Sequence, residues 1–398
     1  MQRHVKYSIG EINMEAYFDN SATTKPKGEV VDIMLKSLTD YYGNPSSLHK
    51  KGVEVEKLVK EARKQLAKSL YAKPEEIIFT SGGTEANNLA ILGTIKSKKR
   101  EGRKIITTKI EHPSVLNVYK TLENEGYEVV YLRIDEYGMI SIDELKENLT
   151  DDTILVSIMH VNNEVGTIQP IEEIGKILKK LKKRPTFHVD AIQSFGKIKI
   201  SPQKIGIDLL SVSAHKVHGP KGVGVLYIKK GTKIQPIVFG GSQETGIRSG
   251  TENVPGILGF GAAVSDFNNK IEEHIEYIKN FREKFKEKIL AQVKDIKVNG
   301  HETCHAPHIL NISFSGIRGE VLLHYLEQYN IYVSTGSACS SNKKSSQSHV
   351  LKSMKLTNEQ IEGAIRFSFS YTNKMEEMDY AIEKIKNSVE ELRMIIKR

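Results

Sequence analysis

Short apolar runs rich in β-branched residues alternate with amphipathic segments from about residue 54 to residue 228. The strand-like runs are EIIFT, KIITT, EVVYLRI, TILVSIMHV, TFHVDAI, DLLSVSA and VGVLYI, whereas EVEKLVKEARKQLAKSL and IEEIGKILKKLKK follow a helical period. Strands that are apolar on both faces are typical of parallel sheets covered by helices on both sides. The pattern therefore predicts an α/β fold, with a large domain over residues 17–265 built on a mainly parallel sheet flanked by helices.

The pattern changes after about residue 266. A long charged segment at 268–293 predicts a helix, and the strand-like runs ILNISFS and YVST follow it, with two more helical segments after them. We expect a smaller α+β domain over residues 266–398. Residues 1–16 are expected either to pack with this small domain or to be an extension, and Met14 offers a second possible start.

The composition is that of a globular protein with a sizeable core. Hydrophobic residues make up 39% of the 398 residues and charged residues 27%. No run approaches the roughly 18–20 apolar residues that span a bilayer, and the N-terminus lacks the apolar stretch of a secretory signal. With only two cysteines, a disulfide framework is excluded. We therefore expect a cytoplasmic protein without a membrane partner.

The net charge of +9 permits acidic or nucleic-acid partners. Much of the excess lies in stretches such as KILKKLKKR and FREKFKEKI, which are typical of solvated helix faces. The chain has no Trp, few aromatic residues and no recognisable nucleic-acid-binding module. The charge thus favours Lys-rich surface helices, and no direct nucleic-acid partner is expected.

Polar residues that follow the predicted strands are the candidates for chemistry, because open α/β sheets bind ligands beyond the carboxyl ends of their strands. After EIIFT, the stretch Ser81-Gly82-Gly83-Thr84 could bind an anion at a helix N-terminus, or could be a tight turn with a Thr cap. No Gly-Lys-Ser/Thr follows, so this is not a P-loop. His112 follows KIITT and could contact a flat ligand, act as an acid or base, or be structural.

Two further strand ends carry charged residues. Asp190 ends TFHVD, where a buried carboxylate requires a cation, either a protonated ring nitrogen or an Arg or Lys. Lys216 follows DLLSVSA and could form an imine in a sheltered site. A carboxylate facing a pyridinium and a lysine forming a Schiff base are together what pyridoxal phosphate requires.

Many longer motifs point the same way. FDNSATT, YYGNPSSLH, TSGGTEANN, MHVNNEVGTIQPI, HVDAIQSFGK, SAHKVHGPKGVG, RSGTENV, GSAC and IRFS occur in this order over nearly the whole chain. In these motifs the sequence resembles the NifS/IscS group of cysteine desulfurases, in the class V aminotransferase family. The resemblance implies the fold type I of pyridoxal-phosphate enzymes and a homodimer with active sites at the interface. It also implies removal of sulfur from L-cysteine, which yields L-alanine and a persulfide on Cys339.

The resemblance also implies residue roles. Lys216 would hold the cofactor and take the Cα proton of the substrate, Asp190 would pair with the pyridine nitrogen, and Gln193 would bind the ring hydroxyl. His112 would stack on the ring and shuttle protons, and Asn163 and Arg366 would hold the substrate carboxylate, with Asn163 also at the cofactor. The implied phosphate site consists of Gly83, Thr84, Ser213 and His215, together with Thr251 from the second subunit.

Cys339 lies in the stretch STGSACSS, whose small residues suit a loop better than a core. The resemblance makes it the nucleophile, and the nearby Lys343 and Lys344 could lower its pKa. The other cysteine, Cys304, lies in HETCHAPH, which invites a zinc interpretation. The spacing is cramped for one tetrahedral site, so a structural loop is favoured and no intrinsic metal is expected.

The sequence departs from the family pattern after Cys339, where SSNKKSSQS lacks a Pro that is common there, and after IRFS. It also ends without the tail of desulfurases that dock the iron–sulfur scaffold. The sequence thus leaves two alternatives for the sulfur acceptor: a protein of iron–sulfur cluster assembly or an enzyme of tRNA thiolation. The alternative functions are a selenocysteine lyase or another class V pyridoxal-phosphate enzyme, a nucleic-acid-binding protein, and an inactive sulfur-delivery scaffold.

Overall fold

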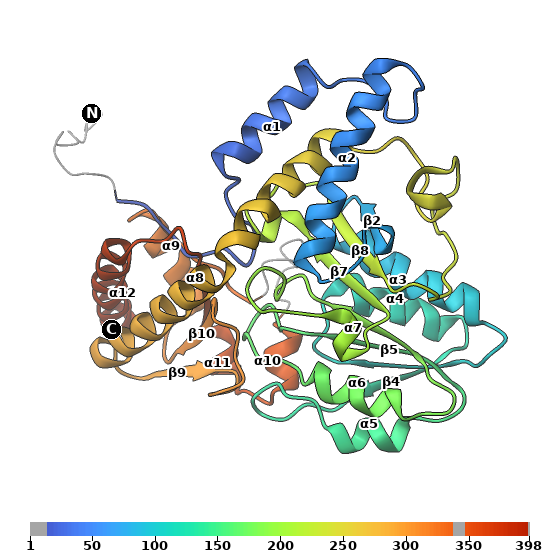
Figure 1. The fold of residues 1–398 in the computed structure, drawn as a ribbon. Coiled ribbons are helices and arrows are strands. Elements are labelled where there is room, and N and C mark those ends of the chain that lie inside the picture. Colours follow the sequence, from blue (N-terminus) through green and yellow to red (C-terminus); the bar gives the residue numbers. More distant parts are fainter. Residues whose placement is uncertain (1–13, 337–346, 397–398) are drawn as a thin grey trace, which may run out of the picture.

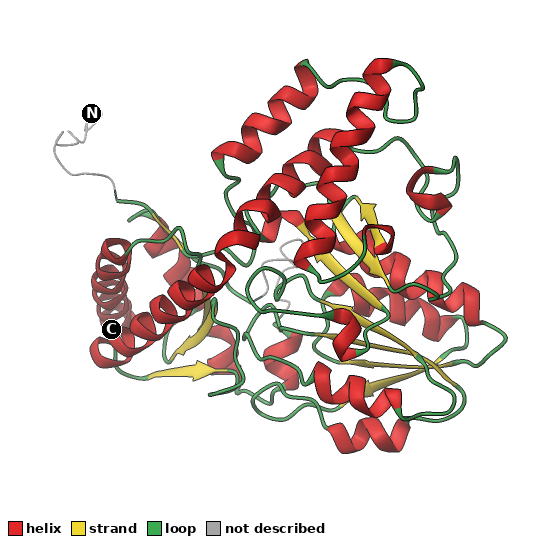
Figure 2. Cartoon of the chain, viewed as in Figure 1, coloured by secondary structure: helices red, strands yellow, loops and turns green. Residues whose placement is uncertain are grey.

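The structure, a computed structural model, describes residues 14–336 and 347–396. Its largest element is a seven-stranded sheet in the order β2-β8-β7-β6-β5-β3-β4 (Figures 1 and 2). These strands are β2 (Ile77–Thr80), β3 (Lys104–Thr108), β4 (Glu128–Leu132), β5 (Thr153–Met159), β6 (Thr186–Asp190), β7 (Leu209–Ser213) and β8 (Gly224–Ile228). Neighbours pair in parallel except at β8, which runs antiparallel to both β2 and β7. The predicted mainly parallel sheet is therefore confirmed.

Helices cover both faces of this sheet (Figure 2). On one face, α2 (Lys50–Ser69), α6 (Ile171–Lys179) and the first part of α8 (Val254–Gln292) share a core with Phe187, Val189 and Val212 of the strands. On the other face, α3 (Gly83–Lys98) and α4 (Pro113–Asn124) pack through two further apolar clusters. Strands β3, β5, β6 and β7 are buried at every position, which explains their continuous apolar sequence.

The C-terminal part of the chain has its own sheet and core. Strands β9 (Ile296–Asn299), β10 (Ile309–Phe314) and β12 (Ala364–Ser368) form an antiparallel sheet in the order β12-β10-β9. Helices α9 (Gly319–Glu327) and α12 (Met375–Ile396) and the second half of α8 pack with it. Strand β1 (Ala16–Tyr17) pairs in parallel with β11 (Ile331–Tyr332), which ties the N-terminal segment to this part.

Shorter elements complete the fold. They are α1 (Gly28–Thr39), α5 (Ile142–Asn148), α7 (Pro202–Ile205), α10 (His349–Ser353) and α11 (Asn358–Glu362), with short 3-10 turns at Pro74–Glu76, Ala214–Lys216 and Gln243–Gly246. Among the described residues after β11 there are therefore three helices, where the sequence pattern predicted two. Within the described ranges, no helix combines the length and apolar character needed to cross a membrane.

Helix α8 begins earlier than the sequence pattern predicted. We expected a helix from residue 268, but α8 starts at Val254, with the Asn253 side chain accepting from the Gly256 N–H as its cap. Its first turns, VPGILGFGAAV, lie against the large core and lack the charged face that a surface helix shows. The helix runs past the proposed boundary between residues 265 and 266, with non-helical dihedral angles at Lys270 (Figure 1). The division into two domains at this point remains a prediction.

Candidate active site

A cavity of about 550 Å³ opens at the carboxyl ends of β3, β5, β6 and β7. Its walls come from the turns that follow these strands and, from the C-terminal part of the chain, from β12 and the start of α10. Ligands bind at this edge in open α/β sheets. The predicted site residues that line it are Gly83, Thr84, His112, Asn163, Asp190, Gln193, Ser213, His215, Lys216 and Arg366.

Lys216 and Asp190 reach the cavity from neighbouring strands. Lys216 ends a single 3-10 turn directly after β7, and its Nζ donates to the carbonyl oxygens of Ser21 and Ala22 at 2.5 and 2.6 Å. Asp190 is the last residue of β6 and is 5% exposed. Burial raises the pKa of Asp190 above its usual range. The N–H groups of Ile192 and Asn87, which donate to its carboxylate, act in the opposite direction and lower this pKa. Across the described residues, Asp190 forms no ion pair.

A hydrogen-bonded chain links Asp190 to His112. Asn87 Nδ2 donates to Asp190 Oδ2 at 2.8 Å and to Ser114 Oγ at 2.9 Å, and Ser114 Oγ lies 2.8 Å from His112 Nδ1. His112 caps α4, and its Nδ1 accepts from the Ser114 N–H. A backbone N–H can only donate, so the neutral His112 ring carries its proton on Nε2. Burial lowers the pKa of His112, which favours this neutral form.

The first turn of α3 contributes an anion cradle to the cavity. Gly82 has a φ of +153°, which side chains rarely adopt. A Cβ on Gly83 would lie 2.2 Å from Ile192 Cδ1, so a larger residue here would require the Ile192 side chain to move. Thr84 is the second residue of the helix, and Ser213 and His215 line the same cavity, with Ser213 Cβ 3.7 Å from where a Cβ on Gly83 would lie. Burial lowers the pKa of His215 to about 4. The free N–H groups and hydroxyls here suit a phosphate group.

Arg366 brings a cation into the same cavity from β12. Its Nη2 pairs with Asp19 Oδ1 at 2.8 Å and its Nη1 donates to the carbonyl of Asn163 at 2.9 Å. Its Nε is buried and has no partner among the residues that the structure describes. Arg366 lines the cavity, and a guanidinium there is suited to a carboxylate ligand. Asp19 holds Arg366 in place and was not singled out from the sequence.

One predicted site residue lies away from the cavity, and another lies outside the described residues. Thr251 is exposed and does not line the cavity. Cys339 lies outside the described residues, as do Lys343 and Lys344. Cys304 is exposed. Within residues 14–336 and 347–396, no three His, Cys, Asp or Glu side chains gather where they could hold a metal ion.

Sequence reasoning also missed several residues that line or support the cavity: Ser21, Asn87, Ser114, Glu164, Ser348 and His349. Asn87 gave one available signal, because it lies four residues after Gly83 on a helix whose buried face is apolar apart from Asn87 and Thr94. A polar residue at such a position needs a buried partner. Ser348 and His349 gave no comparable signal, because nothing local in the sequence indicates that they contact the turns after β5 and β3.

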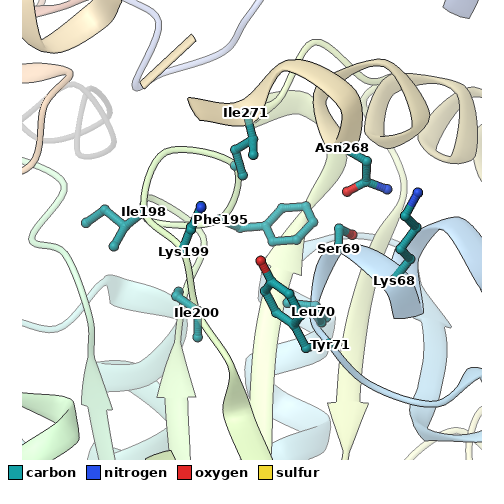
Figure 3. Close-up of a pocket in the computed structure, with 11 residues that line it drawn as sticks. Lys68, Ser69, Leu70, Tyr71, Phe195, Ile198, Lys199, Ile200, Asn268 and Ile271 are labelled. Atoms are coloured by element: carbon teal, nitrogen blue, oxygen red, sulfur yellow. The ribbon is translucent and has the colours of Figure 1, made fainter. Parts of the chain in front are cut away.

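A second hollow, of about 170 Å³, lies between the end of α2, the turn at residues 195–200 and α8 (Figure 3). Phe195 and Ile271 point into it, and Lys68 and Lys199 stand at its edge. Lys199 is exposed and pairs with Glu272. The lining contains no buried acid or base, so the acid–base groups described above belong to the other cavity.

Comparison with known proteins agrees with this geometry. The family described as Aminotransferase class-V matches residues 16–381. The chain is 44% identical to a protein named cysteine desulfurase IscS from Dictyoglomus turgidum, over 96% of each chain, and 46% identical to a cysteine desulfurase from Trichormus azollae, over 95% of this chain and 94% of that one. A solved NifS-like protein superposes with a TM-score of 0.88 at 40% identity, over 94% of this chain and 99% of that one. The chain therefore belongs to the class V aminotransferase family and, within it, to the cysteine desulfurases.

Proposed function

We propose that the cavity beyond β6 and β7 carries pyridoxal phosphate and takes sulfur from L-cysteine, with Cys339 as the first acceptor. The cysteine desulfurases of this family depend on pyridoxal phosphate. The observation that carries the proposal is the meeting of Asp190, Lys216 and His112 in one cavity.

The donor set fits this cofactor at both ends. Asp190 is a buried carboxylate with no ion pair in the described part of the chain, and a protonated ring nitrogen would supply the missing cation. At the other end, the α3 N-terminus with Thr84, Ser213 and His215 would hold the phosphate. Gln193 Nε2 already donates to the Ser21 carbonyl, and its Oε1, which lies 3.5 Å from His308 Nε2, has a second lone pair to accept from the ring hydroxyl.

Pyridoxal phosphate, when bound, supplies an electron sink for the Cα of an amino acid. The remaining work falls to side chains of this protein. Lys216 Nζ would hold the cofactor and move the Cα proton, and Arg366 with Asn163 would orient the substrate carboxylate. His112, neutral and protonated on Nε2, exchanges protons at the reacting atoms.

Sulfur transfer then requires a nucleophile from outside the described residues. The Cys339 thiolate attacks the sulfur of the substrate, and the Cβ–S bond breaks. Its electron pair stays on the amino acid, which takes up a proton at Cβ and leaves as L-alanine. Cys339 keeps the sulfur as a persulfide for an acceptor protein of iron–sulfur cluster assembly or of tRNA thiolation.

We further propose that the protein acts as a homodimer. Thr251 is exposed in the single chain, which fits a role as a phosphate ligand in the other subunit's site. One face of α1 and the segment after it expose Val31, Leu35, Leu38 and Tyr42 at 52%, 60%, 64% and 69%. An apolar stripe of this kind is typical of a surface that another chain covers.

The test is an absorption spectrum of the purified holoenzyme before and after L-cysteine is added, with assays for L-alanine and sulfide under reductant. A spectral change together with both products supports the proposal. A yellow protein that ignores L-cysteine but turns over selenocysteine would replace it with a selenocysteine lyase. A protein that cannot be reconstituted with pyridoxal phosphate would overturn the roles of Lys216 and Asp190.

A further inference from the structure

One buried carboxyl group contacts the described chain on both sides of the segment that contains Cys339. The segment outside the structure runs from residue 337 to residue 346, so Gly336 precedes it and the described chain resumes at Gln347. Ser348 Oγ donates to Glu164 Oε2 at 2.5 Å. A Cβ on Gly336 would lie 2.4 Å from the same Oε2, so the Gly336 backbone packs directly on this carboxyl group. Glu164 thus meets the chain on either side of Cys339.

Glu164 is itself firmly held. Its side chain lines the cavity, and the residue is 3% exposed. Its N–H donates to Asn162 Oδ1 at 2.9 Å, and its carbonyl accepts from Asn311 Nδ2, on β10, at 3.1 Å. The backbone that carries the carboxyl group is therefore attached to the turn after β5 and to the C-terminal sheet at once. A residue held in this way can fix the position of the groups that it binds.

The C-terminal end of the segment is fixed by a second set of contacts. While Ser348 donates to Glu164, its Oγ accepts from the Leu351 N–H and caps α10. His349 Nε2 donates to the Glu111 carbonyl at 3.0 Å. Val350 and Leu351 are buried against Met159 and Val165. These contacts attach the chain just after the segment to the ends of β3 and β5, beside the cavity.

We propose that Glu164 is a positioning residue that fixes both ends of the Cys339 segment, so that the nucleophile is delivered to the cavity. This inference rests on the proposed function. It gives a reason for burying a carboxyl group that has no ion-pair partner among the described residues. Burial raises the pKa of Glu164 to about 7, and the Ser348 hydrogen bond and the Arg366 charge oppose that shift.

The test compares four single variants and the Glu164→Ala/Ser348→Ala double variant. Glu164→Ala removes the acceptor, Ser348→Ala removes the donor, and Glu164→Gln keeps an acceptor oxygen of the same reach. Glu76→Ala is the matched control, because Glu76 is equally buried and binds two backbone N–H groups but lies away from the cavity. The first measurement is the rate of tryptic cleavage after Lys343 or Lys344 in the cofactor-free protein. The second is persulfide formation on Cys339 in the holoenzyme, recorded beside its spectral change with L-cysteine.

We expect Glu164→Ala and Ser348→Ala each to speed cleavage and to slow persulfide formation by roughly tenfold, the value of a hydrogen bond to a charged group. The spectral change with L-cysteine should persist, Glu164→Gln should recover much of the loss, and the double variant should lose no more than either single one. Glu76→Ala should leave the cleavage rate unchanged.

Two results would overturn the role of Glu164. One is cleavage and persulfide formation at wild-type rates in both alanine variants. The other is a spectral response that falls in step with persulfide formation, since Glu164 would then act on the substrate. If the wild type forms no persulfide, the proposed function fails, and the cleavage rates alone decide whether Glu164 holds the segment.

Discussion

Asn87 donates a hydrogen bond to Asp190 across 2.8 Å, from the first turns of α3 to the end of β6. The same amide group donates to Ser114, which contacts His112. The Asn87 side chain therefore helps to position both Asp190, which is proposed to pair with the ring nitrogen, and His112, which is proposed to stack on the ring face. Because Asn87 is fully buried, it cannot exchange these contacts for water.

Asn87→Ala should weaken the binding of pyridoxal phosphate by roughly tenfold, because the Asp190 carboxylate loses a donor that favours its charged form. Titration of the cofactor-free variant with pyridoxal phosphate measures this. Asp190→Ala should bind more weakly still. Equal affinities for Asn87→Ala and the wild type would mean that Asp190 does not depend on this contact.

Substitutions of Lys216 and of Cys339 should affect different steps of the reaction. Lys216→Ala should lose alanine formation by a factor of at least about 10², the contribution typical of a positioned acid–base group. Cys339→Ser should keep the spectral change with L-cysteine and lose persulfide formation. Stopped-flow spectra and product assays distinguish the two. A Cys339→Ser enzyme that forms alanine at the normal rate would remove Cys339 from the reaction.

Subunits with complementary defects should restore one another if Thr251 serves the partner's site. Thr251→Ala and Lys216→Ala should each be nearly inactive alone. Co-expressed, they should recover roughly a quarter of wild-type activity, because half the dimers are mixed and each mixed dimer has one intact site. No recovery in a preparation that contains mixed dimers would place Thr251 in its own subunit's site.

The apolar stripe on α1 provides a separate test of the dimer. Leu35→Glu combined with Leu38→Glu places charge on the exposed face and should yield monomers, measured by sedimentation. Lys36→Glu, on the same helix, is the control for added charge alone. Dimers that withstand the double substitution would exclude this stripe from the interface.

Buried His188 should make stability fall as the pH is lowered. Burial lowers the pKa of His188 to about 3, and its ring nitrogens contact Ser157 and Ser211. Below the unfolded pKa of about 6.5 the unfolded chain binds a proton that the folded chain does not, so stability is lost as the pH falls toward 3. Between pH 7 and pH 5 this amounts to about 2 kcal/mol.

His188→Gln removes this contribution. The variant should be less stable than the wild type at pH 7, yet lose about 2 kcal/mol less of its free energy of unfolding between pH 7 and pH 5. Urea unfolding at pH 7 and at pH 5 measures the difference. The buried acids are present in both proteins, so their contribution cancels in the comparison. Parallel losses in the two proteins would show that His188 is not kept neutral by the fold.

The sequence predicted the parts of the site that follow strand ends. Asp190 and Lys216 each come directly after a buried apolar run, and parallel strands bring such ends to one edge. Arg366 came from the resemblance alone, because β12 belongs to a different sheet and only the packing of the two sheets brings it to the cavity.

Other features depended on long-range contacts that no local pattern reveals. The first half of α8 was missed because burial removes the polar face on which a helical period depends. The reversal at β8 did have a signal, since the connection from Ser213 to Gly224 is short for a parallel crossover. Asn87 and Glu164 bind partners far away in the chain, and their roles emerge only once the strands and α10 are in place.

The most direct test of the account is the mass of the Cys339 peptide after the holoenzyme has reacted with L-cysteine. The account predicts one added sulfur atom on Cys339, L-alanine formed in equal amount, and neither product in Lys216→Ala. Sulfur on Cys304 instead, or sulfur on Cys339 that does not depend on Lys216, would contradict it.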